Sequence, residues 1–461
     1  MKKRQNDLGQ DPIFSLVLRL AIPTMLAQLV SVLYSIVDRM YIGNIPDIGT
    51  TALAGVGVCG PIVTLLSSFA TLIGLGGSPI MAMRMGQGQK DMAQRILNTC
   101  FLVLVVLSLG LTALFLLTKE HLLLWFGASA DTFPYADTYM TIYTAGTFFA
   151  LMATGMNSFL ICQGFSGLGM GTVMLGAALN IVLDPVFIFL LDLGVAGAAI
   201  ATVLSQMASC AFVLLSLRSR KMPVRLGWGG FRWAIVRKVL AFGVSPFLII
   251  ATDSILLIVL NAVLQHYGGP GFGDTLVACA TIVQSYMLLI TMPMGGITLG
   301  CQPVISFNYG AGRPDRIRSA MKVIVGLCVL FCTLMLVVTY TLSPLFTRLF
   351  TDDADTMARS VTYIKRFTCM LLPLAVQYPL VDEMTALAQV RRALFCSLFR
   401  KTVFFTGLLA LPFFFGAEAT FFSEPIADLV AATMTSVLFL RSFPRVLRRC
   451  ETFREHPTEP I

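Results

Sequence analysis

The chain has few charged residues. Only 12% of its 461 residues are Asp, Glu, Lys or Arg, whereas 56% are hydrophobic, and soluble domains carry roughly twice that charged fraction. The apolar residues occur in long blocks, such as residues 101–117 and 204–217, and a helix needs about 20 largely apolar residues to cross a bilayer. The sequence shows no segments of alternating hydrophobicity of the kind that membrane β-strands have. The composition therefore argues against a soluble protein and predicts an all-α integral membrane protein.

The sequence also lacks the patterns expected of a metal centre or a nucleophilic enzyme. It contains only three His, and its eleven Cys are scattered through apolar segments. Cys328 and Cys332 stand one helical turn apart with no second pair nearby, which is poor spacing for zinc. The stretch GFSGLGMG at 164–171 has no Lys-Ser/Thr, so it predicts a tight turn rather than a phosphate loop. We therefore expect buried free thiols, no cofactor and no enzymatic activity.

The basic residues are unevenly distributed. The formal net charge of +9 could indicate a nucleic-acid partner, but most Lys and Arg fall in alternate connections between apolar segments. These clusters lie at residues 2–4, 84–95, 218–238, 313–322, 391–401 and 441–454. Short or acidic connections separate them. Because basic loops stay on the cytoplasmic side, we predict a multi-pass protein of the cell membrane with both termini in the cytoplasm and no nucleic-acid partner.

The breaks between apolar segments predict twelve transmembrane helices. The first follows a basic N-terminus and is too long for a signal peptide. An even number of spans agrees with both termini on one side of the membrane. The expected limits are 13–41, 51–83, 96–118, 135–159, 168–191, 195–217, 240–266, 275–305, 320–346, 360–387, 393–415 and 421–443.

The second half of the chain repeats the first at one constant shift, the repeat shift, which takes position 76 to position 300. GGSPIMAMRMGQGQKD at 76–91 matches GCQPVISFNYGAGRPD at 300–315, and the same shift takes FGASADT at 126–132 to FTDDADT at 350–356. Both copies begin on the cytoplasmic side, so they are parallel six-helix repeats, an arrangement that commonly places a substrate cavity at the repeat interface. We predict an N-lobe at 1–222 and a C-lobe at 223–461 with a cytoplasmic tail.

One set of polar residues is present only in the first repeat. The repeat shift takes Asp38, Asn180, Asp184 and Thr202 to Ala262, Phe404, Leu408 and Ile426. A purely structural role would require them in both copies, so their one-sided presence indicates a function. Two acids in a dry site do not both stay charged, and one shared proton or monovalent cation would relieve them. Pro185 removes the helical donor to the carbonyl of Ile181, which could help to bind that cation.

Several of these segments resemble the MATE (multidrug and toxic compound extrusion) family. They are IPTMLAQLVSVLYSIVDRMYIGNI, ALNIVLDPVFIF, GVAGAAIATVLSQ and EPIADL, and the resemblance extends over nearly the whole chain. It implies twelve helices in two six-helix lobes, and efflux by antiport against H⁺ or Na⁺. It also implies a cation site of Asp38, Asn180, Asp184 and Thr202, surrounded by a hydrogen-bond network with Tyr139 and Asn157. Pro23 matches a proline at which the first helix of the family is thought to bend.

The sequence departs from the family at two places. Ile161 stands where many members have an Arg, and EMTALA, preceded by Asp382, replaces a stretch like FFQALG. Another branch of the family carries acids in its seventh and tenth helices. Asp253 lies in the seventh predicted helix and Asp382 and Glu383 in the tenth, which leaves open a second cation site in the C-lobe.

These observations predict a cation-coupled antiporter that exports amphipathic organic cations by alternating access. Its expected partners are those small molecules and membrane lipids, and we expect a monomer. A flippase for a lipid-linked oligosaccharide remains the alternative. It would favour a basic cavity for pyrophosphate, and Arg39 is the main basic residue away from the predicted loops. A membrane enzyme and a channel fit less well, because the sequence offers no catalytic constellation and carries its polar set in one repeat only.

Overall fold

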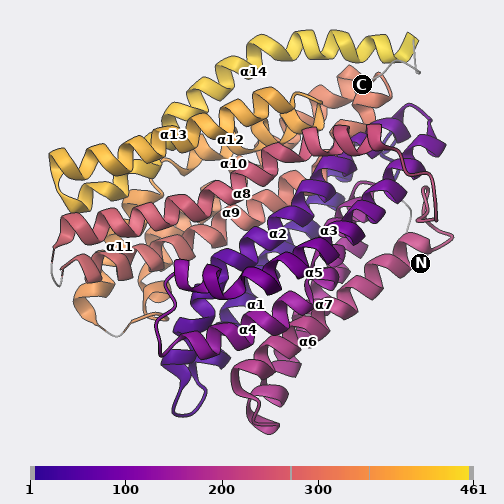
Figure 1. Cartoon of the computed structure of the whole chain (residues 1–461). Helices are drawn as coiled ribbons and strands as arrows, with labels where there is room; N and C mark the ends of the chain where they lie inside the picture. Colours follow the sequence, from indigo (N-terminus) through magenta and orange to yellow (C-terminus); the bar gives the residue numbers. More distant parts are fainter. Residues whose placement is uncertain (1–5, 270–271, 352, 456–461) are drawn as a thin grey trace. The chain divides into compact units, whose positions relative to one another are not determined.

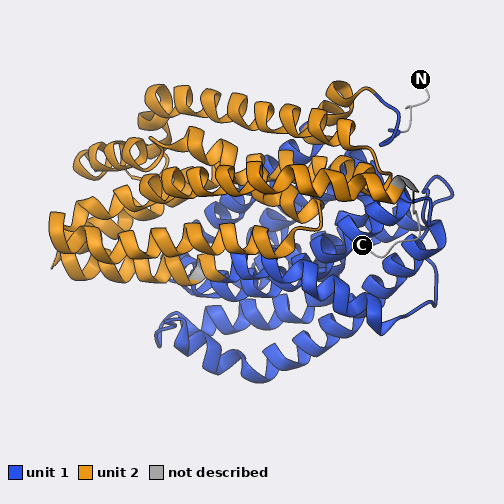
Figure 2. Cartoon of the chain, turned by 90° about the horizontal axis from the view of Figure 1, so that it is seen from above, with its two compact units in different colours: residues 1–11, 22–251 blue, residues 12–21, 252–461 orange. Residues whose placement is uncertain are grey.

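The computed structural model describes residues 6–269, 272–351 and 353–455. Every regular element in this part of the chain is helical: fourteen α-helices, one π-helix and one 3-10 helix (Figure 1). The described part divides into two compact units (Figure 2). Unit 1 comprises residues 1–11 and 22–251, and unit 2 comprises residues 12–21 and 252–461. The lobe limits expected from the sequence, 1–222 and 223–461, stay a prediction.

Unit 1 is built from the first half of the helices. They are α1 (Ile13–Gly43), α2 (Gly49–Gly86), α3 (Lys90–Trp125), α4 (Phe133–Ala145), α5 (Thr147–Ile161), α6 (Ser166–Pro185), η1 (Val186–Leu190), α7 (Gly194–Arg218) and the start of α8 (Trp233–Gly268). The first turns of α1, up to Ala21, belong to unit 2. Helix α7 packs against α4, α5 and α6.

Unit 2 contains the second half. Its helices are the end of α8, α9 (Phe272–Gly310), α10 (Pro314–Thr347), α11 (Ala354–Phe367), α12 (Leu371–Ala386), α13 (Val390–Phe415), η2 (Ala417–Phe422) and α14 (Ser423–Glu455). Helices α13 and α14 lie side by side, and α12 packs on α9, α10 and α14 (Figure 1).

A helical segment stands at each of the twelve predicted spans. In the described residues, ten helices are long and apolar enough to cross a membrane, and α4 with α5 makes an eleventh if that pair, bent by 56°, is one span. The span expected at 360–387 is divided into α11 and α12. Neither piece is long enough alone: α11 has 14 residues and α12 has 16. The predicted all-α membrane architecture is confirmed.

The bend between α4 and α5 occurs at Gly146, where a neighbouring helix comes very close. A Cβ on Gly146 would lie 2.5 Å from Cγ2 of Val203 on α7. Real Cβ atoms do not approach other heavy atoms this closely, so glycine permits the tight packing. The close contact brings α7 against the helices that surround the polar residues of unit 1.

The connection between α7 and α8 is held against unit 1 by two buried amide side chains. The amide oxygen of Gln163 accepts from the N–H of Val224 at 2.9 Å. Asn98 accepts from the N–H of Gly227 at 3.0 Å and donates to the carbonyl of Gly229 at 3.1 Å. Because each amide satisfies main-chain groups of the connection, the long basic segment follows a fixed course over the ends of α3 and α5.

The cysteines are free, as the sequence predicts. Ten of the eleven are buried, and Cys369 is the exposed one. The residues that the structure describes contain no group of three or more His, Cys, Asp or Glu side chains that could hold a metal ion.

Candidate cation site

Three helices of unit 1 bring four of the predicted polar residues together. Asn180 on α6 donates from its amide nitrogen to Oδ1 of Asp184 at 3.0 Å, and the same nitrogen lies 3.5 Å from Oγ1 of Thr202 on α7. Asp184 and Asn180 are buried, with 0% and 2% of their surfaces exposed. Their spacing of four residues places them on one face of α6, and that face meets Thr202.

The fourth member is Asp38 on α1. Its carboxyl group lies close enough to that of Asp184 for the two side chains to hydrogen-bond to one another. A hydrogen bond between two carboxyl groups requires a proton on one of them. Arg39 is exposed and acts on Asp38 only through its charge. Within the described part of the chain, no salt bridge to a Lys or Arg is found for Asp38 or Asp184.

Three oxygen atoms of this cluster are enclosed without a hydrogen-bond partner among the described residues. They are Oδ1 of Asp38, Oδ2 of Asp184 and Oδ1 of Asn180. Buried polar atoms are nearly always paired, so an unpaired set drawn from two helices needs an explanation. Oxygen atoms are the ligands that hard cations take in proteins, and a carboxylate oxygen can equally take a proton.

The end of α6 is adapted to Pro185. Because Pro185 has no N–H to donate, the next donor, the N–H of Val186, turns back to the carbonyl of Leu183. The chain then widens into the π-helix η1, where the N–H of Leu191 bonds to the carbonyl of Val186. Single π-turns are frequent at functional sites. The proline thus ends regular α-helix directly after Asp184.

Helix α7 approaches this π-turn closely. A Cβ on Gly197 would lie 2.6 Å from the carbonyl oxygen of Phe187, so only glycine fits at that position without movement of the backbone. Thr202 lies five residues further along α7, on the same part of the helix that this contact fixes. The π-turn and Gly197 together place Thr202 beside Asn180.

Aromatic side chains surround the two acids. Tyr139 on α4 interacts electrostatically with Asp38, and its ring stacks on that of Tyr143 with 6.0 Å between centroids. Tyr34 lies within electrostatic range of Asp38, Asp184 and Tyr143. Gln206 donates to the hydroxyl of Tyr143 at 3.5 Å.

The sequence did not identify three of these neighbours: Tyr34, Tyr143 and Gln206. Each stands four residues from a predicted member of the site, namely Asp38, Tyr139 and Thr202. Residues four apart share a helix face, so the sequence carried a usable signal for all three.

Asn157 lies away from this cluster. Its amide nitrogen, on α5, donates to the carbonyl of Gly169 at 3.4 Å. Gly169 precedes Asp184 by about four turns of α6, which corresponds to roughly 22 Å along the helix axis. Pro23 lies within α1, directly after the point at which the chain passes from unit 2 to unit 1.

Two of the acids expected in the second lobe lie on α12. Oδ2 of Asp382 accepts from Oγ1 of Thr298 on α9 at 2.6 Å. Glu383 is fully buried, and both of its carboxyl oxygens lack a hydrogen-bond partner within the described residues. Neither acid forms a salt bridge in that part of the chain.

The third acid, Asp253 on α8, is ion-paired. Its carboxylate accepts from the ammonium group of Lys401 on α13. The neighbouring Arg400 pairs with Glu424 and, at 2.9 Å, with Asp428, both on α14. The sequence placed Arg400 and Lys401 both in a basic connection and in the span expected at 393–415, and the structure agrees with the span. They lie inside α13, where carboxylates of two neighbouring helices neutralise them.

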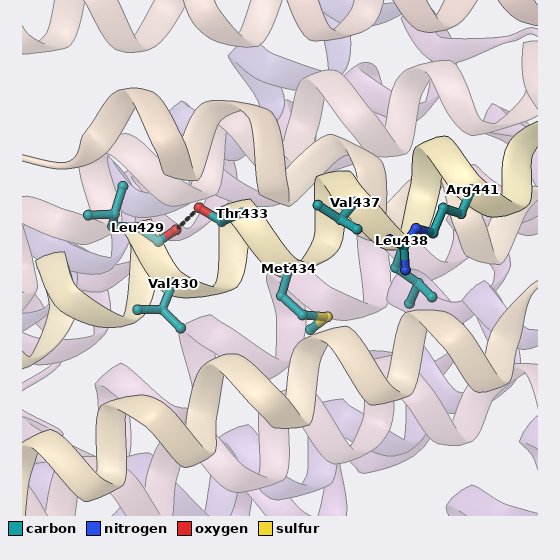
Figure 3. A pocket seen from close by; sticks show the side chains of 7 residues that line it. All are labelled: Leu429, Val430, Thr433, Met434, Val437, Leu438 and Arg441. Carbon is teal, nitrogen blue, oxygen red and sulfur yellow. Dashed lines mark hydrogen bonds between the residues drawn. The ribbon is translucent and has the colours of Figure 1, made fainter.

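A shallow hollow of about 510 Å³ follows one face of α14 (Figure 3). It is lined by Leu429, Val430, Thr433, Met434, Val437, Leu438 and Arg441. The hydroxyl of Thr433 is satisfied by the carbonyl of Leu429 at 2.9 Å, which leaves an apolar surface with one guanidinium group at its end. None of the acids of either unit lines it, so we separate it from the candidate cation site.

Comparison with known proteins identifies the family. The model of the MatE family matches residues 23–186 and 248–405, together more than half of the chain. The repeat shift found in the sequence takes position 23 to position 247, directly before the second matched segment begins. The Multidrug export protein MepA of Staphylococcus aureus (strain MSSA476) is 24% identical over 439 residues, covering 94% of this chain and 95% of that protein.

Solved structures share the fold. An outward-facing multidrug resistance MATE family transporter of the MOP superfamily has a TM-score of 0.88 at 21% identity, covering 97% of this chain and 100% of that one. A MATE protein in the straight conformation has a TM-score of 0.90 at 22% identity, covering 96% and 100%. These likenesses confirm the predicted fold class and the resemblance on which it partly rests. The chain belongs to the MatE family: it is a multi-pass membrane transporter and not an enzyme.

Proposed function

We propose that the chain is an antiporter that exports amphipathic organic cations in exchange for H⁺ or Na⁺, bound at Asp38 and Asp184. One observation carries the proposal: two carboxyl groups from α1 and α6 meet in a buried polar cluster of unit 1 that no Lys or Arg of the described residues neutralises. A buried acid pair of this kind requires a positive partner. The exchanged cation is that partner.

Each member of the cluster has a role in this exchange. Asp38 and Asp184 supply the negative charge, and Asn180 fixes the carboxylate of Asp184 by donating to it. The hydroxyl of Thr202 and the amide oxygen of Asn180 offer further oxygen ligands if the cation is Na⁺. For H⁺, the proton sits between the two carboxyl groups, and the amide of Asn180 selects which one keeps its charge. We assign Tyr139 to the wall that excludes water from the pair, and Asn157 to the more distant hydrogen bonding of α5 with α6.

Cation binding must be coupled to a change of shape. A ligand shifts a conformational equilibrium only if it binds the two states unequally. Asp38 is on α1 and Asp184 is on α6, so neutralising the pair changes how strongly the two helices attract one another. Pro23 interrupts the hydrogen bonds of α1 and allows it to bend, so that α1 responds when the charge at Asp38 changes. We propose that this bend lowers the affinity for the drug and that the two lobes then alternate between outward and inward access.

The substrate class follows from the chemistry of the site and from the relative named above as a multidrug export protein. Acids attract organic cations, and aromatic and Met side chains bind them through cation–π and polarizable contacts. We further propose a monomer with both termini in the cytoplasm, and lipid acyl chains against the apolar hollow of α14. A flippase for a lipid-linked oligosaccharide is disfavoured, because Arg400 and Lys401 inside α13 are already paired with acids and Arg39, on α1, lies beside the carboxyl group of Asp38.

The test is transport by the purified protein in vesicles loaded with a fluorescent organic cation. A pH gradient and a Na⁺ gradient are imposed separately. Efflux that follows one of the two gradients identifies the coupling ion. If neither gradient drives efflux in protein that binds the dye, the antiport proposal fails.

A further inference from the structure

We propose that unit 2 contains a second cation site in which the cation is a side chain of the protein. The ammonium group of Lys401 pairs with the carboxylate of Asp253 and takes the position that a mobile monovalent cation would otherwise occupy. The comparison with an exchangeable cation rests on the function proposed for unit 1, but the experiment below measures only unit 2.

The first support is geometric. Lys401 lies eleven residues into α13, a helix of 26 residues, or roughly 16 Å from its start. Its side chain is only 8% exposed, whereas that of Asp253 is 63% exposed. An ammonium group in the middle of a membrane helix is unfavourable by about 2.5–3.5 kcal/mol on insertion scales. A buried lysine at this depth therefore needs a compensating partner, and here its ammonium group pairs with the carboxylate of Asp253.

The second support comes from the internal repeat. The repeat shift that relates the two halves places α13 opposite α6, and it pairs α8 with α1 and α14 with α7. Unit 1 assembles its polar cluster from Asp38 on α1, Asn180 and Asp184 on α6, and Thr202 on α7. Unit 2 assembles its own from the three corresponding helices: Asp253 on α8, Arg400 and Lys401 on α13, and Glu424 and Asp428 on α14.

The two clusters differ in where their positive charge comes from. Helix α6 supplies Asp184 in unit 1, whereas the corresponding helix α13 supplies two bases in unit 2. The repeat shift relates Arg400 and Lys401 to Gly176 and Ala177 of α6, so unit 1 has no basic side chain at the equivalent positions. Unit 1 must take its cation from solution. Unit 2 carries this cation on the chain and keeps Asp253 neutralised throughout the transport cycle, so Asp253 takes no part in ion exchange.

Removal of the lysine side chain should therefore expose a site for a small ammonium ion. We choose methylammonium as the probe, because it has the same donor group as Lys401 and fits the space that Lys401→Ala would open. Tetramethylammonium is the control, since it has the same charge and no N–H donor. The readout is the melting temperature of the full-length protein in detergent, which a ligand raises when it binds the folded state.

The experiment uses an Asp184→Asn background, which removes one of the two acids of unit 1 and serves as the reference for any response that Asp38 still gives. In the Asp184→Asn/Lys401→Ala protein, we expect methylammonium to give a saturable rise in melting temperature that tetramethylammonium does not give. Asp184→Asn alone should show no such difference. Adding Asp253→Asn should abolish the rise. The Asp253→Asn substitution also removes the carboxylate that Lys401→Ala leaves unpaired. The protein with both substitutions is therefore expected to fold even if Lys401→Ala alone does not.

Three results would overturn the proposal. One is an equal response to the two ammonium ions in the Lys401→Ala protein. Another is a methylammonium response that survives Asp253→Asn. The third is the same stability for Lys401→Ala with and without Asp253→Asn, which would show that the lysine does not compensate this acid. Because these are binding and stability measurements, they stand whether or not the vesicle assay supports antiport.

Discussion

Substitution of Asp184 by Asn removes the exchangeable charge while preserving the shape of the side chain. The amide oxygen of the new residue can still accept from Asn180, so this hydrogen bond changes from charge-assisted to neutral, a loss of about 1 kcal/mol. Removal of a buried carboxylate relieves a burial penalty of about 2.5–3.5 kcal/mol. The relief exceeds the loss by about 1.5–2.5 kcal/mol, so the variant should insert and fold with a melting temperature no lower than that of the unchanged protein.

The effect on transport is much larger. Each pH unit of gradient is worth about 1.36 kcal/mol per proton. For exchange of one proton against one monovalent dye cation, this corresponds to about a tenfold accumulation of the dye per pH unit. The same reasoning applies to a tenfold Na⁺ gradient. With Asp184→Asn, no cation is exchanged at the site, and the ratio of dye concentrations across the membrane should fall to one.

The assay is dye accumulation in proteoliposomes at equal protein incorporation. Asp192→Asn is a matched control, because Asp192 is exposed in the turn that follows η1 and lies outside the cluster. It should accumulate dye as the unchanged protein does. Gradient-driven accumulation that is undiminished in Asp184→Asn would remove the pair of aspartates from the coupling mechanism.

Three further predictions concern the scaffold. Gly197→Ala should lower the melting temperature measurably in detergent, because overpacking costs about 1–3 kcal/mol, whereas Gly171→Ala, whose Cβ would meet its nearest atom at 3.6 Å, should leave it unchanged. Asn98→Ala should speed trypsin cleavage between residues 218 and 238 without changing global unfolding, since it frees the connection before α8. Hydrogen bonds from the side chain and N–H of Thr356 lower the pKa of Asp353. The carboxylate of Asp353 therefore stabilises α11 at a pH above its unfolded-state pKa, and this stabilisation is lost as the pH falls through the lowered pKa of the folded state. Hydrogen exchange should show that the protection of the first turn of α11 falls over that pH range. Asp353→Ala should abolish this pH dependence.

The sequence predicted the regular parts of the fold because they follow from apolar length alone. Each of the twelve segments holds helix, and the repeat shift agrees to within one position with the starts of the two family segments, at 23 and 248. The breaks within spans could not be read in the same way. The bend at Gly146 occurs where Val203 of another helix packs closely, and a hydropathy pattern does not contain such packing. The division between α11 and α12 lies after the basic pair Lys365 and Arg366 and before Pro373 in the first turn of α12, local signals that apolar length alone does not register.

The signal that identified the site was a set of polar residues present in the first repeat and absent from the second. It selected Asp38, Asn180, Asp184 and Thr202, which the structure brings together. From the second repeat to the first, the repeat shift takes Arg400 and Lys401 to Gly176 and Ala177 of α6. This contrast in polarity is as strong as that of Asp184 with Leu408.

Arg400 and Lys401 were counted among the basic connections, although the span expected at 393–415 includes them, because the basic cluster at 391–401 crosses a helix boundary. Helix α13 begins at Val390, so Arg391 and Arg392 lie in its first turn, at the end where basic residues meet water. Lys401 is more than two helical turns further along. At that depth the low dielectric makes an unpaired charge so unfavourable that a basic residue predicts a carboxylate partner on another helix rather than a loop. Asp253 was the available acid, and depth along α13, taken together with the acids left over in α8 and α14, would have predicted the ion pairs that give unit 2 its own cations.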